Sequence, residues 1–178
     1  RGTHNLENAA AAVLACLAAG IDITGIEAGL SSFRPLSHRM ENIGTIHGVS
    51  FFNDSKATNT DAVIRAIECF DTGIVLILGG RVKGTDFSLL APSVQENVKT
   101  IVAIGESRKE IENALSPVCR VIMAADMQDA VEKSFKAAKE NDIVLLSPAC
   151  ASFDMYTSYS ERGEEFIQQV SRLAGEAS

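Results

Sequence analysis

Six consecutive residues, Asp54-Ser55-Lys56-Ala57-Thr58-Asn59, combine an acid, a cation, two hydroxyls and a carboxamide. They follow the apolar run Val49 to Asn53, and a helical pattern begins soon after them at Asp61. A capped turn at this place requires only a single Ser, Thr or Asn side chain. A lysine flanked by Asp54 and Thr58 where a strand ends instead favours the binding of an anionic ligand.

Two further loops follow apolar runs that are typical of buried parallel strands. Residues 79–84, Gly-Gly-Arg-Val-Lys-Gly, combine glycines that allow close backbone approach with the mobile cation of Lys83. Residues 147–152, Ser-Pro-Ala-Cys-Ala-Ser, supply small side chains and hydroxyls. Because ligands of open α/β sheets bind beyond the carboxyl ends of strands, we expect these three loops to carry the function.

The second and third loops also have simpler or different interpretations. Glycine-rich turns are common without a ligand, and residues 79–84 fit neither the Walker A pattern nor GxGxxG. In the third loop Ser147, Cys150 or Ser152 could be a nucleophile. The chain has no GxSxG elbow, however, and no histidine is expected in a carboxyl-end loop to act as its base. We therefore expect residues that crowd a ligand rather than nucleophilic catalysis.

Side chains outside these loops are also candidates for a site. Asn5 and Asn8 are three residues apart and could share a helix face that meets an adenine edge; an N-cap with a solvated amide is the alternative. Arg39 and Glu41 could form a surface ion pair of little energetic value. Tyr159 follows the third loop and could simply be packed near a helix start.

Composition excludes several classes of protein. A net charge of −7 argues against nonspecific nucleic-acid binding or attachment to a membrane surface. No apolar run reaches the roughly 18 residues that a membrane helix requires, and residues 9–19 lack the flanks of a signal peptide. The scattered histidines and cysteines favour a cytoplasmic protein with reduced thiols and no metal centre, and we expect Cys16, Cys69 and Cys119 in the core.

The first 35 residues differ in pattern from the rest. A helical run from Asn5 to Ala19 is stopped by Gly20, and Thr24 is expected to cap a second helix over residues 25–33. Pro35 then marks a break. Because this helical pair begins almost at residue 1 with no strand before it, we expect it to be the tail of a preceding domain and the chain to be a fragment.

From about Leu36 strands alternate with helices. Residues 40–46 and 49–53 predict a hairpin about His47-Gly48. The other expected strands are 73–78, 100–104, 120–123 and 142–146, and the expected helices are 61–70, 107–115, 127–140 and 161–174. This order predicts an α/β fold with a doubly wound, mostly parallel, Rossmann-like sheet. The sheet has an antiparallel edge hairpin, and a short helical segment precedes it.

Taken together, the motifs resemble the C-terminal region of the Mur ligases, and within that family the members that add D-glutamate. DSKATN is the most specific to the family, followed by SPACAS with an aromatic residue and RGxxF. The matching segments are Gly2 to Asn5 with Asn8, Ser37 to Glu41, Asn53 to Asn59, Gly79-Gly80 with Lys83-Gly84, Leu146 to Ser152, and Arg162-Gly163 with Phe166.

The resemblance implies an ATP-dependent ligase of peptidoglycan synthesis. In the family the carboxylate of UDP-N-acetylmuramoyl-L-alanine is phosphorylated, and the amine of D-glutamate attacks the acyl phosphate. Residues 1–35 would be the tail of a central ATPase domain, and residues 36–178 the domain that closes over it. This chain has no P-loop and no obvious cluster for Mg²⁺. The Mg²⁺ ligands are therefore expected mainly upstream, and the chain alone is expected to be inactive.

The resemblance also implies roles for individual residues. Asn5 and Asn8 would meet adenine, Arg39 and Asp54 the ribose and phosphates, and Lys56, the candidate catalytic residue, the phosphates and reaction centre. D-glutamate would be held by Thr58, Lys83, Ser152, the Phe153 backbone and Tyr159, where the family usually has phenylalanine. A ligand with two carboxylates needs a cation and several hydrogen-bond donors, which these residues supply.

Two alternatives stay open. The chain could be a stand-alone module that binds a nucleotide or an acidic metabolite without chemistry. It could also belong to a Mur-type ligase for another amino acid, such as a diamino acid, although no DNPR-like motif occurs. A GTNGK[ST]-like loop encoded upstream would support the ligase.

Overall fold

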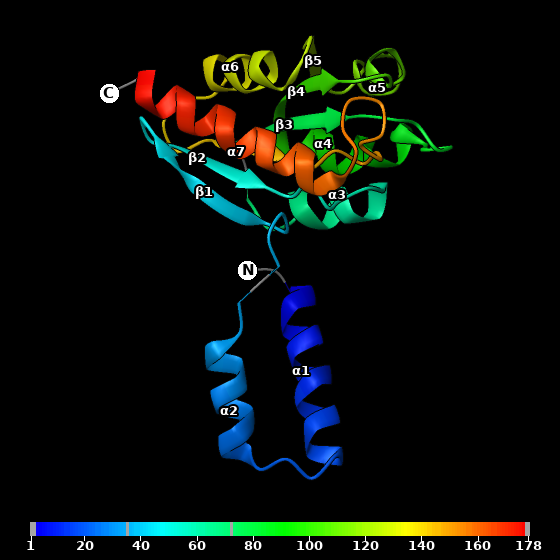
Figure 1. The fold of residues 1–178 in the computed structure, drawn as a ribbon. Coiled ribbons are helices and arrows are strands. Elements are labelled where there is room, and N and C mark those ends of the chain that lie inside the picture. The colour runs from blue at the N-terminus through cyan, green and yellow to red at the C-terminus, as the bar shows by residue number, and fades with distance from the viewer. Residues whose placement is uncertain (1–2, 35, 72, 177–178) are drawn as a thin grey trace. The chain divides into compact units, whose positions relative to one another are not determined.

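The computed structural model describes residues 3–34, 36–71 and 73–176, and the chain divides into two compact units, residues 1–36 and 37–178. Figure 1 shows a helical pair in the first unit and a sheet covered by helices in the second. That the first unit is the tail of a preceding ATPase domain stays a prediction.

The first unit consists of α1 (Thr3–Ala18) and α2 (Ile23–Ser32). The alanine-rich sequence favours α1, and Gly20, with φ +81°, supplies the left-handed residue that follows its end. Among its described side chains only Ile26 is buried. Its exposed apolar side chains include Leu6, Leu14, Leu17, Ile23, Leu30 and Phe33.

The cap of α2 differs from the sequence prediction, because Asp22 is the N-cap residue and not Thr24. The Asp22 carboxylate accepts hydrogen bonds from the Gly25 N–H and the Thr24 hydroxyl, each at 2.7 Å. Thr24 already lies in the first turn, since the helix begins at Ile23. Asp and Thr are both good caps, so the sequence did not distinguish them.

The second unit contains a six-stranded sheet in the order β1-β2-β6-β3-β4-β5. The predicted hairpin is confirmed: β1 (Glu41–Ile46) pairs antiparallel with β2 (Val49–Asn53), and its turn residues His47 and Gly48 both have positive φ. All other pairs are parallel, as predicted. The remaining strands are β3 (Ile74–Gly79), β4 (Val98–Ile104), β5 (Arg120–Met123) and β6 (Ile143–Leu146).

Helices cover both faces of this sheet (Figure 1). The central strand β3 is buried throughout; Leu76 belongs to the core on one face and Ile77 to the core on the other. Strands buried on both faces have continuous apolar runs, as residues 74–78 do. One core includes residues of α3 (Thr60–Ile67), α4 (Ala91–Asn97) and α5 (Arg108–Leu115). The other includes residues of α6 (Met127–Ala137) and α7 (Tyr159–Glu176).

Two short elements between β3 and β4 were not predicted. They are the 3₁₀ helix η1 (Phe87–Leu90) and the helix α4, which has Pro92 in its first turn. Pro is well tolerated there, but a seven-residue helix shows too few turns for its periodicity to be recognised. Leu90 and Val94 are fully buried, so the two elements form part of the core.

The cysteines differ in part from expectation. Cys16, Cys69 and Cys119 are half-buried rather than buried, although Cys119 packs against the core, whereas Cys150 is buried. The thiol of Cys119 donates to the Val98 carbonyl oxygen at 3.5 Å. No helix within the described part of the chain is long and apolar enough to cross a membrane.

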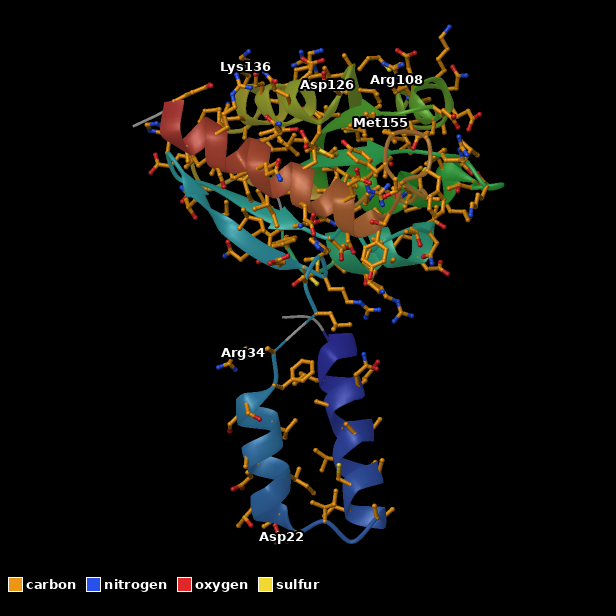
Figure 2. The ribbon with its side chains drawn as sticks, in the orientation of Figure 1. Asp22, Arg34, Arg108, Asp126, Lys136 and Met155 are labelled. Carbon is orange, nitrogen blue, oxygen red and sulfur yellow. The ribbon has the colours of Figure 1, made fainter. Side chains whose placement is uncertain are left out.

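Polar side chains fix the loops on the β4 side of the sheet, where Figure 2 labels two of them. Asp126 is the N-cap of α6, and its carboxylate accepts from the Asp129 N–H at 2.9 Å. Arg108, the first residue of α5, donates to the carbonyl oxygens of Gly105 and Ala124 at 2.9 and 3.1 Å. The carboxyl end of β4 is thereby joined to the residue that follows β5.

Candidate functional site

The carboxyl ends of β2, β6 and β3 are adjacent and end at the same level in the sheet. Leu146 at the end of β6 is paired with Asn53 of β2 on one side and with Ile77 of β3 on the other. After β3 the chain adds β4 and β5 outward, then returns to place β6 between β2 and β3. The loops that follow these strands therefore lie at a topological switch point, where open α/β sheets bind ligands.

Backbone hydrogen bonds join the three loops that the sequence singled out. The N–H groups of Ala149, Gly79 and Arg81 donate to the carbonyl oxygens of Ala57, Pro148 and Ala151 at 3.0, 2.9 and 2.8 Å, respectively. Gly80 has φ +143°, and a β-carbon there would collide with the Ala151 carbonyl oxygen. The close approach that this glycine allows is thus to the third loop.

Asp54 is the first residue of the first loop and is buried. Its Oδ2 accepts from the Ser147 hydroxyl at 3.0 Å, and its Oδ1 accepts from the Met40 N–H at 3.3 Å. Burial raises the pKa of Asp54 to about 6, although both hydrogen bonds and the charge of Arg39 act in the opposite direction. Asp54 thus links the third loop to the segment before β1.

His38 lies at this edge of the sheet, which the sequence analysis did not expect of any histidine. Its imidazole Nδ1 is 2.9 Å from the Asn53 amide nitrogen, which also donates to the Gly163 carbonyl oxygen at 3.2 Å. The Glu41 carboxylate accepts a hydrogen bond from the backbone N–H of His38 at 2.8 Å, and it thereby stabilises the backbone just before β1. The match of residues 37–41 to the family was the available signal.

Arg162 lies at the site, although reasoning from individual side chains did not identify it as a candidate. Arg162 is 2% exposed, and its guanidinium donates through Nε to the Ser55 hydroxyl at 3.0 Å and through Nη2 to the Ser55 carbonyl oxygen at 2.7 Å. Nη1 donates to the Cys150 carbonyl oxygen at 3.0 Å. Burial lowers the pKa of Arg162 to about 10, so the group is charged at neutral pH. Arg162 therefore joins the first and third loops from beneath.

Lys56 and Tyr159 are brought together, although 103 residues separate them in the chain. The Lys56 Nζ lies 3.2 Å from the Tyr159 hydroxyl oxygen and 4.5 Å from the centre of its ring. The Lys56 N–H donates to the His38 carbonyl oxygen at 3.1 Å. Hydrogen bonds therefore hold the candidate catalytic lysine both at its backbone N–H and at its ammonium group.

The other candidate amino-acid ligands lie on the same three loops. Thr58 is exposed, whereas Asn59 caps α3 by accepting from the Ala62 N–H at 2.9 Å, which is the simple role of a turn residue. The Lys83 Nζ lies 5.3 Å from the centre of the Phe153 ring, which is 52% exposed. The ammonium groups of Lys56 and Lys83 thus lie over the rings of Tyr159 and Phe153, which both belong to the segment that follows β6.

Nucleophilic catalysis by the third loop has no support in the structure. The Ser147 hydroxyl donates to Asp54, and burial raises the pKa of the Cys150 thiol to about 11. Ser152 is buried, and its carbonyl oxygen accepts from the Tyr156 N–H at 2.8 Å. The nearby imidazole of His38 is engaged by the Asn53 amide. None of these three groups is an activated nucleophile.

The structure gives the exposure of two candidate nucleotide-binding residues. Asn8 on α1 and Arg39 are both exposed, while the side chain of Asn5 lies outside the described residues. Within residues 3–34, 36–71 and 73–176, no three His, Cys, Asp or Glu side chains form a group that could hold a metal ion. Both carboxylate oxygens of Asp54 already have protein partners.

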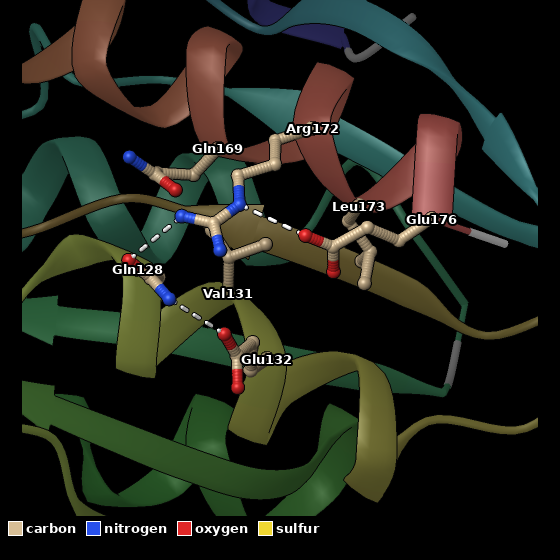
Figure 3. Close-up of a pocket in the computed structure, with 7 residues that line it drawn as sticks. All are labelled: Gln128, Val131, Glu132, Gln169, Arg172, Leu173 and Glu176. Carbon is tan, nitrogen blue, oxygen red and sulfur yellow. Dashed lines mark hydrogen bonds and ion pairs between the residues drawn. The ribbon is translucent and has the colours of Figure 1, made fainter.

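A shallow pocket between α6 and α7 is shown in Figure 3 and contains none of the candidate residues. Its polar side chains bond one another: Arg172 donates to Gln128 at 3.1 Å and to Glu176 at 2.9 Å, and Gln128 donates to Glu132 at 3.0 Å. These mutual bonds leave few groups for a ligand, so we place the site at the carboxyl ends of the strands.

A family model described as "Mur ligase, glutamate ligase domain" matches residues 38–150, which include the first two loops and most of the third. The chain belongs to the Mur ligase family. Relatives named UDP-N-acetylmuramoylalanine--D-glutamate ligase are 43% identical in Desulfosudis oleivorans and 45% identical in Chlorobium phaeobacteroides. The matches cover 97% and 96% of this chain, but only 38% and 36% of the relatives' lengths.

Solved structures of Mur-type ligases have the same fold. The UDP-N-acetylmuramate-alanine ligase from Thermotoga maritima matches 97% of this chain and 39% of its own, with a TM-score of 0.69 and 17% identity. A pseudomurein peptide ligase type C from Methanothermus fervidus matches 97% of this chain and 36% of its own, with a TM-score of 0.71 and 17% identity. At these identities the similarity concerns the fold alone, and it confirms the predicted α/β class.

Proposed function

We propose that this chain is the C-terminal part of an ATP-dependent ligase that adds D-glutamate to UDP-N-acetylmuramoyl-L-alanine in peptidoglycan synthesis. The observation that carries the proposal is the placement of Lys56, Thr58, Lys83 and Ser152 on three hydrogen-bonded loops at one edge of the sheet. Relatives 43–45% identical that bear the name of this ligase support the choice of amino acid.

The reaction divides between this chain and the rest of the protein. ATP supplies the phosphoryl group that activates the carboxylate. The amine of D-glutamate then forms the C–N bond as the C–O bond to phosphate breaks, and ADP and phosphate leave. Lys56 would neutralise the charge that gathers on the acyl phosphate and the tetrahedral intermediate. Positioning, rather than a protein nucleophile, would supply the rest of the catalysis by this chain.

D-glutamate would bind where the second and third loops meet. Lys83, Thr58 and Ser152 offer a cation and two hydroxyls to its two carboxylates, and the Phe153 backbone and Tyr159 border the pocket. Lys83 would leave the Phe153 ring to pair with a carboxylate, because a charge-assisted hydrogen bond is stronger than an exposed cation–π contact. The arrangement suits a small acidic amino acid.

Each unit contributes candidate nucleotide-binding residues. Asn5 and Asn8 would contact adenine, and Arg39 and Asp54 the ribose and phosphates. Asp54 would exchange its bonds to Ser147 and Met40 for ribose hydroxyls when the nucleotide binds. Mg²⁺ would be held mainly by the preceding part of the protein, since both oxygens of the Asp54 carboxylate are already engaged by hydrogen bonds and no group of three potential metal ligands occurs among the described residues.

In the intact protein, Lys83→Ala and Thr58→Ala should each raise the Michaelis constant for D-glutamate, by about 10- to 100-fold for the lysine and less for the threonine. The Michaelis constant for ATP should change less than about threefold, because neither residue is expected to touch the nucleotide. Steady-state ligation kinetics measure both constants. Lys136→Ala, with a side chain 75% exposed on α6, is the control. An equal rise in the Michaelis constants for D-glutamate and ATP would contradict the assigned pocket.

A further inference from the structure

The ammonium group of Lys56 has a defined place although the side chain is long and flexible. Its Nζ donates to the Tyr159 hydroxyl at 3.2 Å and lies 4.5 Å from the centre of the ring. A single aromatic side chain thus contacts the cation through both its polar tip and its π face. Lysine has four rotatable stem bonds, so an ammonium without such contacts would sample many positions.

Tyr159 is itself held by rigid parts of the fold. It is the first residue of α7, and its carbonyl oxygen accepts from the Ser55 hydroxyl at 2.7 Å. Its ring lies edge-on to the His38 imidazole, with centroids 6.3 Å apart and an interplanar angle of 77°. The phenol therefore offers a fixed support for a lysine that lies on a loop.

We propose that Tyr159 is a positioning residue, whose ring and hydroxyl together hold the Lys56 ammonium in place for the reaction. This assigns the hydroxyl to Lys56 rather than to D-glutamate. What Lys56 acts on, the acyl phosphate and the tetrahedral intermediate, rests on the proposed function. The contact between the two side chains does not.

The chain itself offers a test of the contact that does not depend on activity. It has two tyrosines and no tryptophan, so its phenolate absorbance reports Tyr156 and Tyr159 alone. The hydrogen bond from Lys56 is the largest cause of a lowered pKa at Tyr159, followed by a bond from Ser160, whereas burial raises the pKa of Tyr156 to about 12. The two phenols should therefore ionise in separate steps.

In an absorbance titration, Lys56→Met should move the lower transition upward and leave the upper one in place. Tyr159→Phe should abolish the lower transition, which assigns it. A lower transition at the same pH in Lys56→Met and in the unaltered chain would overturn the contact.

In the intact ligase, Tyr159→Phe keeps the ring and should lower kcat about tenfold, with Michaelis constants for ATP and D-glutamate changed less than about threefold. Tyr159→Leu also loses the ring and should lower kcat about 100-fold. An unchanged kcat in Tyr159→Phe would overturn the positioning role. Absence of ligation by the unaltered intact protein would instead count against the proposed function, and the titration would still decide on the contact.

Discussion

Replacing Arg162 with methionine should lower the free energy of unfolding of the α/β unit by about 3 kcal/mol. Methionine fills much of the volume but donates no hydrogen bond. The carbonyl oxygens of Ser55 and Cys150 would then remain buried without the donors that the guanidinium supplies. Each buried acceptor left unsatisfied costs about 1–3 kcal/mol, partly offset because a buried charge is removed.

Urea unfolding followed by tyrosine emission measures this effect in the relevant unit, since both tyrosines lie within residues 37–178. Arg172→Met is a matched control on the same helix: its side chain is 55% exposed in an ion pair with Glu176, and the expected loss is below about 1 kcal/mol. Arg162→Lys keeps the charge without the planar guanidinium. Its loss of unfolding free energy should therefore lie between those of Arg162→Met and Arg172→Met. Equal losses of unfolding free energy for Arg162→Met and Arg172→Met would contradict the conclusion that Arg162 holds the first and third loops together.

The second large effect is a pH dependence that originates in Asp54. Its pKa is raised from 3.8 to about 6 by burial, so the folded protein binds this proton more tightly than the unfolded chain. The stability that Asp54 contributes is therefore complete below about pH 4 and is lost as the pH rises through about 6. The shift corresponds to about 3 kcal/mol over that range.

Asp54→Asn removes the titration while keeping a side chain of the same shape. The stability of the unaltered chain minus that of Asp54→Asn should fall by about 3 kcal/mol between pH 4 and pH 8. The control is Asp129→Asn, because hydrogen bonding to Lys133 lowers the pKa of Asp129. The stability that Asp129 contributes is present above about pH 4 and is lost below it. The stability of the unaltered chain minus that of Asp129→Asn should therefore not change from pH 5 upward. A stability difference between the unaltered chain and Asp54→Asn that does not change between pH 4 and pH 8 would show that burial does not destabilise the charged carboxyl of Asp54.

Local patterns predicted the fold because they coincide with its physical requirements. The apolar run from Ile74 to Leu78 predicted a strand, and the observed strand β3 is buried on both faces. His47-Gly48 predicted the hairpin turn, where both residues adopt positive φ. The helix α4 was missed because it is short and begins beside Pro92, so that its burial depends on packing rather than on periodicity.

The site was predictable in its loops but not in its connections. The residue types at the carboxyl ends of the strands identified Asp54, Lys56 and Lys83 as candidates. That Arg162 joins two loops follows from contacts to backbone carbonyl oxygens up to 107 residues away, which no local pattern encodes. The contact of Lys56 with Tyr159 has the same character, since the tertiary fold creates it.

The most direct test of the proposed function is a ligation assay of the intact protein with UDP-N-acetylmuramoyl-L-alanine, ATP and alternative amino acids. We predict ADP release and product formation that depend on D-glutamate, with kcat/KM at least about 100-fold lower for L-glutamate. Lys56→Met should abolish product formation. Ligation of L-glutamate or a diamino acid at the rate of D-glutamate, or no ligation of any of them, would contradict the proposal.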